Sequence, residues 1–242
     1  MSEVKVMDIY TDASLLGKID PVKKNLVCAG AVAIGEGGRR LAELHRRLQG
    51  STNNAGELTG IALAVMIIHR YQDEYKEFNI YSDSLLSIRT LREWIFEWLS
   101  ESSERGDECL PERVKNQEII LRIADFVSHQ INPDIKINLV HCNGHINKDN
   151  KNHMRKAFYN IMSNYKTIRS GAQTKLKEKV KTIQMWNDYI DRSTRLSLKE
   201  MQFDIEYIYD DVLDYRYVFC KHPIFEYANN YSNIISQNLI LK

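Results

Sequence analysis

The stretch "IYTDAS" at residues 9–14 nearly returns at residues 80–84 as "IYSDS". In each copy a β-prone run stops at an aspartate, Asp12 or Asp83, which is flanked by small and mostly hydroxyl-bearing residues. The residues between the copies suffice for two further strands and a crossover helix, so the two runs can lie parallel as neighbours. Neighbouring strands are about 4.8 Å apart. The repeat therefore predicts two carboxylates close together at one edge of a sheet.

Outward from this pair, strand and helix patterns alternate along the chain. We expect strands over residues 4–11, 25–34, 39–48, 77–83 and 135–140. We expect helices after residue 51, over 84–99, over 117–131 and within 147–165, with a polar loop at 100–114. This order predicts an α/β fold with a mixed sheet and flanking helices.

The composition is that of an ordinary globular protein. The 242 residues carry a net charge of +1, so nucleic acid would have to be bound by local patches. The longest apolar run, "IALAVMII", is far shorter than the roughly 20 residues that span a bilayer. The start of the chain lacks a signal-peptide pattern, and the four cysteines form no C-x-x-C pair. We expect a cytoplasmic protein without a membrane partner.

A third acidic residue, Glu57, falls in the first turns of the helix that follows "STNN" at 51–54. Taken singly, a strand-end aspartate is usually a turn residue, and a glutamate early in a helix usually complements the helix dipole. Together, the three carboxylates are hard oxygen donors that favour Mg²⁺, or alternatively Mn²⁺, over zinc. Two such ions about 3.5–4 Å apart are typical equipment for phosphodiester hydrolysis.

The quoted stretches resemble the ribonuclease H family, specifically the type 1 enzymes that cut RNA in RNA–DNA hybrids. The resemblance covers roughly residues 4–162. The most specific part of the resemblance is the succession of three stretches, "YTDAS", "STNNAGEL" and "YSDSLLSIRTLREW". The weaker parts are "VKNQEI" (114–119) and "IKINLV" (135–140).

The resemblance implies a ribonuclease H-like fold, with a five-stranded mixed sheet in the order 3-2-1-4-5. It implies that Asp12, Glu57 and Asp83 bind the metal ions, with Asp12 shared between both. It also implies that three asparagines lie against the hybrid: Asn53, Asn54 and Asn116. For Asn53 and Asn54, helix capping is an equal alternative.

Two parts of the family pattern do not align without gaps. The family has a catalytic-loop histidine after its fifth strand; direct counting reaches Asn143, and His145 in a longer loop is the preferred candidate. A solvated loop histidine is the alternative. The family then has a fourth aspartate early in the last helix, where this chain has Met154.

The nearest candidates for that fourth position are His153, through an imidazole nitrogen, and Asp149, which precedes the helix. Of these, His153 is the predicted metal ligand. A site with an imidazole ligand would suit Mn²⁺ better than Mg²⁺.

Two charged segments bear on where the phosphates of a substrate would be held. Residues 97–112 contain six acids and one arginine, so they should repel phosphates, whereas residues 166–182 contain six bases and one acid. A solvated helix face is the alternative for this basic segment. We expect a catalytic domain at 1–162 and a mostly helical extension at 163–242, which grips substrate or forms a homodimer or partner-protein surface.

The leading interpretation is a two-metal endoribonuclease that hydrolyses the RNA strand of RNA–DNA hybrids. The alternative is a non-catalytic nucleic-acid-binding module with an incomplete metal site. A proofreading-type exonuclease is disfavoured, because such enzymes place Asp-x-Glu on the first strand and this chain has Asp12, Ala13 and Ser14.

Overall fold

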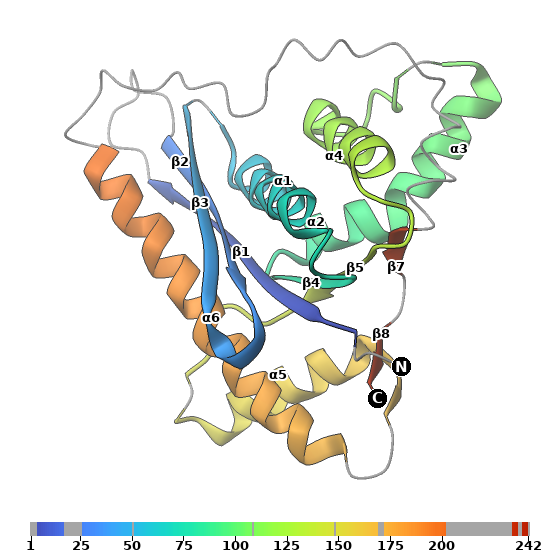
Figure 1. The fold of residues 1–242 in the computed structure, drawn as a ribbon. Coiled ribbons are helices and arrows are strands. Elements are labelled where there is room, and N and C mark those ends of the chain that lie inside the picture. The colour runs from blue at the N-terminus through green and yellow to red at the C-terminus, as the bar shows by residue number, and fades with distance from the viewer. Residues whose placement is uncertain are drawn as a thin grey trace.

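The computed structural model describes residues 4–16, 26–49, 51–107, 109–147, 149–168, 172–201, 234–236 and 239–241. A six-stranded mixed sheet with the order β3-β2-β1-β4-β5-β7 forms its centre (Figure 1). The strands are β1 Val6–Leu16, β2 Leu26–Ile34, β3 Arg40–Gln49, β4 Glu77–Ser82, β5 Lys136–His141 and β7 Ile235–Ser236. The first five have the predicted order 3-2-1-4-5, which confirms the predicted fold.

The helices agree in place with the sequence patterns. They are α1 Asn53–Tyr71, α2 Leu85–Arg89, α3 Ile95–Arg105, α4 Gln117–Gln130, α5 Lys151–Ser163 and α6 Ala172–Met201, with a π-helical turn at Thr90–Trp94 and a short 3-10 turn at Glu36–Gly38. The loop expected from residue 100 is wrong in its first part, since α3 continues to Arg105. Leu99 and Ser102 are buried on this last stretch, and Gly106 ends it with a φ of 69°.

The first strand runs further than the sequence predicted. Its parallel ladder with β4 ends at the pair Thr11 and Ser82, but its antiparallel ladder with β2 continues to Leu16. The strand therefore does not stop at Asp12, as expected, because β2 still satisfies its backbone. Asp12 is instead the first residue of β1 after the end of its parallel ladder with β4, and Asp83 is the first residue after β4 itself.

One face of the sheet is covered by α1 and α4 (Figure 1). A single large apolar cluster fills this layer, and its largest part is aliphatic. It includes Met7, Ile9, Phe78 and Ile80 from the strands, Ile61, Val65 and Ile68 from α1, and Ile120, Ile123 and Val127 from α4. This burial anchors α1 along its length and so fixes the helix that carries Glu57.

The other face is covered by α5 and by the long helix α6, drawn in orange in Figure 1. The buried cluster here joins Tyr10, Val32, Tyr81 and Val140 of the sheet to Leu176, Val180, Ile183 and Ile190 of α6. The rings of Tyr10 and Tyr81 stack with centroids 5.0 Å apart. The first helix of the predicted extension, α6, thus shares a core with the sheet. A domain boundary after residue 162 stays a prediction.

Short strands complete the described part of the chain. β7 adds a parallel neighbour to β5, and β6 (Tyr165–Ile168) pairs in parallel with β8 (Leu239–Leu241). Residues 202–233, within the segment predicted to give a dimer or partner surface, lie outside the described residues. Among the helices that are described, none has the length and apolar character needed to cross a membrane.

Candidate metal centre

Three acidic side chains from three elements converge where the parallel ladder between β1 and β4 ends. Asp12 comes from β1, Glu57 from α1, and Asp83 from the residue after β4. One carboxylate oxygen from each lies within 4.8 Å of the others. Asp12 and Glu57 are only 5% and 4% exposed, and Asp83 is partly buried. The structure thus brings together the three carboxylates that the sequence singled out.

Local hydrogen bonds fix the carboxylate of Asp12 and the backbone that carries the other two. The Ala13 backbone N–H donates to Asp12 Oδ1 at 2.7 Å. The side chain of Thr52 caps α1 by accepting from the Ala55 N–H at 3.2 Å, which starts the helix so that Glu57 falls in its second turn. The ring of His141 lies 3.2 Å from the carbonyl oxygen of Asp83 and steadies the backbone there.

The electrostatics of the cluster favour a bound cation. Burial, followed by the charges of Asp83 and Asp191, raises the pKa of Asp12 to about 8. Burial, followed by the charges of Asp12 and Asp83, raises the pKa of Glu57 to about 9. Burial also raises the pKa of Asp83, although His145 and His141 oppose it. Each group resists carrying its charge unless a positive ion neutralises it.

One atom of the cluster is left without a hydrogen bond. Glu57 Oε2 is buried and has no hydrogen-bond partner among the described residues. A buried carboxylate oxygen in that state is costly, and a metal ion would satisfy it. The donor set is made of carboxylate oxygens, which suit Mg²⁺ or Mn²⁺. The residues present therefore fit a hard divalent cation.

A fourth carboxylate, Asp191 of α6, lines the same cavity and is not among the site residues predicted from the sequence. It lines a cavity of about 590 Å³ together with Asp12, Glu57 and Asp83. The side chain is 16% exposed, and the Arg195 Nε lies 2.9 Å from its Oδ1. Asp191 therefore shares the cavity with the three other acids, and its charge acts on Asp12 and Asp83.

A signal for Asp191 exists in the sequence, although it is weak. The buried positions Leu176, Val180, Ile183 and Ile190 recur at helical spacing and mark the face of α6 that meets the sheet. Asp191 is next to Ile190 and so lies at the edge of that stripe, which continues through the buried Thr194 and Leu198. An acid beside a buried stripe can indicate a site, but the pattern alone does not say which strand the helix lies on.

His145 also reaches the cavity. Its ring Nδ1 lies 3.9 Å from Asp191 Oδ2, and its side chain is 71% exposed at the rim. The preceding residue, Gly144, lies directly against Asp83: a Cβ added there would be 3.0 Å from the Asp83 Cγ and closer still to a carboxylate oxygen. The loop can pass over Asp83 only because residue 144 has no side chain.

The predicted substrate asparagines are placed differently from one another. Asn53 lines the cavity, and its Nδ2 donates to Glu57 Oε1 at 3.5 Å. Asn54 is exposed in the first turn of α1, and Asn116 is the N-cap residue just before α4, with a φ of 57°. Neither lines the cavity. Thr52, and neither Asn53 nor Asn54, caps α1.

The two candidates for the fourth metal position lie elsewhere. His153 is exposed near the start of α5, where its Nδ1 accepts from the Asn147 backbone N–H at 3.4 Å. Asp149 is exposed just before α5. Neither residue lines the cavity. The structure brings Asp191, rather than His153, to the three carboxylates.

Comparison with known proteins gives a family match. The family model for RNase H matches residues 4–160. A search of curated proteins found no match.

Several solved structures are similar to the chain. LC11-RNase H1, isolated from compost, is 19% identical; the similarity covers 65% of this chain and 96% of that one, with a TM-score of 0.42. The PFV RNase H domain is 19% identical, with 66% and 92% covered and a TM-score of 0.46. The protease-reverse transcriptase of prototype foamy virus is 16% identical with a TM-score of 0.47; the similarity covers 68% of this chain but only 21% of that one.

Proposed function

Because this chain belongs to the ribonuclease H family, we propose that it is a metal-dependent endonuclease that hydrolyses the RNA strand of RNA–DNA hybrids. Its products would carry 3′-hydroxyl and 5′-phosphate ends. The observation that carries this proposal is the carboxylate cluster of Asp12, Glu57 and Asp83, with its buried and unpartnered Glu57 oxygen. Such a cluster is costly in a protein that holds no cation there.

Four carboxylates would hold the ions: Asp12, Glu57, Asp83 and Asp191. Bound Mg²⁺ or Mn²⁺ would supply an activated water and charge stabilisation at the scissile phosphate. The role of the chain itself is to hold the four carboxylates in place around the ions, and to give up the protons of Asp12 and Glu57. The raised pKa values of Asp12 and Glu57 mean that both acids release protons when the cation binds.

Asp191 fits the fourth position better than the predicted His153 does. It lies on the wall of the same cavity, whereas His153 does not. A fourth carboxylate also gives an all-oxygen site, which removes the reason to expect a preference for Mn²⁺. The alternative, a non-catalytic nucleic-acid-binding module, rests on the absence of a fourth metal ligand. The position of Asp191 in the cavity weakens the case for that alternative.

Basic residues beside the acids support a phosphate-bearing substrate. Arg195 and Lys199 line the cavity with Asn53 and can hold the backbone near the reacting phosphate. His145 stands at the rim, where it can help proton movement or product release. The basic segment predicted as a grip includes Lys181, which lies ten residues before Asp191 on α6, or about 15 Å along the helix. It would contact the duplex away from the cut.

The test is a labelled RNA–DNA hybrid incubated with the protein and Mg²⁺ or Mn²⁺, beside duplex RNA and duplex DNA. We expect cleavage of the hybrid alone, internal to the RNA strand. Asp12→Asn should abolish it, whereas Asp149→Asn, which removes an exposed carboxylate outside the cavity, should not. Hybrid cleavage that survives Asp12→Asn, or no cleavage in either metal, would contradict the proposal.

A further inference from the structure

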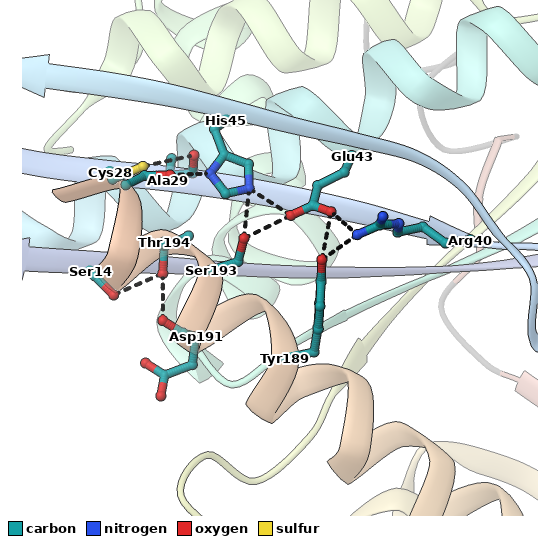
Figure 2. A network of polar contacts seen from close by, with 11 residues as sticks. Ser14, Cys28, Ala29, Arg40, Glu43, His45, Tyr189, Asp191, Ser193 and Thr194 are labelled. Atoms are coloured by element: carbon teal, nitrogen blue, oxygen red, sulfur yellow. Dashed lines mark hydrogen bonds and ion pairs between the residues drawn. The ribbon is translucent and has the colours of Figure 1, made fainter. Parts of the chain in front are cut away.

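The side of α6 that faces away from the cavity is attached to the edge strand β3 by polar contacts (Figure 2). Glu43 of β3 accepts a hydrogen bond from the Tyr189 hydroxyl at 2.8 Å and from the Ser193 hydroxyl at 2.7 Å. His45, two residues along β3, places its Nδ1 2.9 Å from the Ser197 hydroxyl. Three positions of α6, spaced four apart, are thus held along one strand.

Glu43 is the centre of this group. Its Oε1 lies 3.0 Å from His45 Nε2, and its Oε2 accepts from Arg40 at 2.7 Å. Both oxygens therefore have partners from α6 and from β3. The side chain is only 20% exposed, so water competes weakly for these bonds. Burial by itself would raise the pKa of Glu43, but the hydrogen bonds from Ser193, Tyr189 and His45 lower it, and charge-assisted bonds are the stronger kind.

The helix geometry links this contact to the cavity. Asp191 is two residues from both Tyr189 and Ser193, which on an α-helix is a rotation of about 200°. A helix that turns Tyr189 and Ser193 toward β3 therefore turns Asp191 the other way. Figure 2 shows the Asp191 carboxylate directed away from Glu43 and His45.

The distance between α6 and the sheet is set by contacts other than those with Glu43 and His45. Gly30 of β2 lies under the helix, where an added Cβ would be 2.7 Å from Thr194 Cγ2 and 2.9 Å from Ile190 Cδ1. The hydroxyls of Thr194 and Ser14 are 2.8 Å apart. The apolar contacts at Gly30 bring the helix down onto the sheet, but they are not directional and resist a roll about the helix axis poorly. The hydroxyl contact between Thr194 and Ser14 is directional and adds to the contacts at Glu43.

We propose that Glu43 is a positioning residue: its carboxylate fixes the rotation of α6 and so keeps Asp191 directed at Asp12 and Asp83. This inference rests on the proposed role of Asp191 at the metal centre. A roll of about 20° would move a side chain at the helix surface by about 2 Å. Metal and catalytic sites need their ligands held to about 0.5 Å, so a small roll is enough to remove Asp191 from a shared ion.

The test is a titration of the intact protein with Mn²⁺, without nucleic acid, in which calorimetry measures the binding. We expect Glu43→Ala and Asp191→Asn each to weaken one and the same Mn²⁺ site about 3- to 10-fold. Glu43→Gln, which keeps one carbonyl acceptor, should have an intermediate effect. Glu74→Gln, an exposed carboxylate just after α1, is the matched control and should have none.

The decisive variant is the double substitution. If Glu43 acts only through Asp191, Glu43→Ala will not weaken Mn²⁺ binding further when Asp191→Asn is already present. Effects that add, or a Glu43→Ala protein that binds Mn²⁺ like the unmodified chain while Asp191→Asn does not, would overturn the positioning role.

Hydrogen exchange provides the second readout. In Glu43→Ala the amides of residues 188–198 should exchange faster, while those of α1 keep their protection. If that variant does not fold, the Tyr189→Phe variant is used in its place, because it removes a single hydrogen bond to the same carboxylate. Unchanged exchange in α6 would count against the proposal. A protein that binds Mn²⁺ as described but cuts no hybrid would refute the proposed function and leave the positioning role standing.

Discussion

The two faces of the sheet are built differently. The face under α1 and α4 is filled by a continuous apolar cluster. The face under α6 has a smaller cluster with stacked tyrosines. The buried polar side chains of α6 on this face include Asn187 and Thr194, which form hydrogen bonds with Cys142 and Ser14. The first face depends on non-directional burial, whereas the second also depends on hydrogen bonds whose directions matter.

This difference suggests a division of work. The first face carries most of the apolar burial and holds α1, which brings Glu57 beside Asp12. The second face carries a helix whose rotation decides where Asp191 points. Substitutions on the first face should therefore lower stability first, and substitutions on the second should disturb the metal centre first.

The largest expected effect comes from the ligands themselves. We expect Asp12→Asn to lower the rate of hybrid cleavage by at least about 10³-fold, and Asp191→Asn by about 10²-fold, because both remove charge from the ion-binding site. Initial rates in saturating Mg²⁺ measure this. An Asp191→Asn rate equal to that of Asp149→Asn would mean that the second face contributes nothing to the site.

A matched pair of core substitutions separates the faces. Ile68 and Ile183 are both fully buried, one on α1 and one on α6. We expect Ile68→Ala to lower the free energy of unfolding by about 2–5 kcal/mol while the folded protein keeps its Mn²⁺ affinity. Ile183→Ala should cost less in global unfolding by urea but weaken Mn²⁺ binding. The reverse pattern would refute the division of work.

The loop over Asp83 offers a test that belongs to neither face. Gly144→Ala should lower kcat about 10- to 100-fold, because the new methyl group pushes the Asp83 carboxylate out of position. The loop lies at the rim, so the free energy of unfolding should change by no more than about 1 kcal/mol. Normal kcat with reduced stability would show that the contact matters to folding alone.

The smallest expected effect is on the stability of the metal-free protein. The pKa values of Asp12 and Glu57 are raised in the folded state, so between about pH 4 and pH 9 the folded chain keeps protons that the unfolded chain loses. Stability should therefore fall as pH rises through this window. Asp12→Asn should stabilise the metal-free protein by about 0.5–2 kcal/mol at pH 8, as measured by urea unfolding in a chelator.

Saturating Mg²⁺ should remove this pH dependence, because the ion takes the place of the protons. A metal-free stability that stays constant or rises between pH 5 and pH 9 would mean that burial and the neighbouring charges do not raise the pKa values of Asp12 and Glu57 as described.

The sequence predicted the parts of the site that local patterns determine. Asp12 and Asp83 follow β-prone runs, and Glu57 follows a capped helix start, so each could be assigned to an element and an end. The length of β1 could not be assigned in this way, because it depends on β2 pairing beyond the end of β4.

Asp191 and Glu43 could not be found for a related reason. Asp191 lies beyond the stretch that resembles the family, on a helix whose apolar stripe fits any sheet face. The bond from Ser193 to Glu43 joins residues 150 positions apart, and no local pattern reports such a pairing. His153 drew attention instead because it is near the expected position along the chain.

The most direct test of the metal centre is a crystal of the protein soaked in Mn²⁺, with the ions located by anomalous diffraction. The structure predicts manganese bound by Asp12, Glu57 and Asp83, with Asp191 as the ligand from α6. Manganese bound at His153, or none within bonding distance of Asp12, would contradict it.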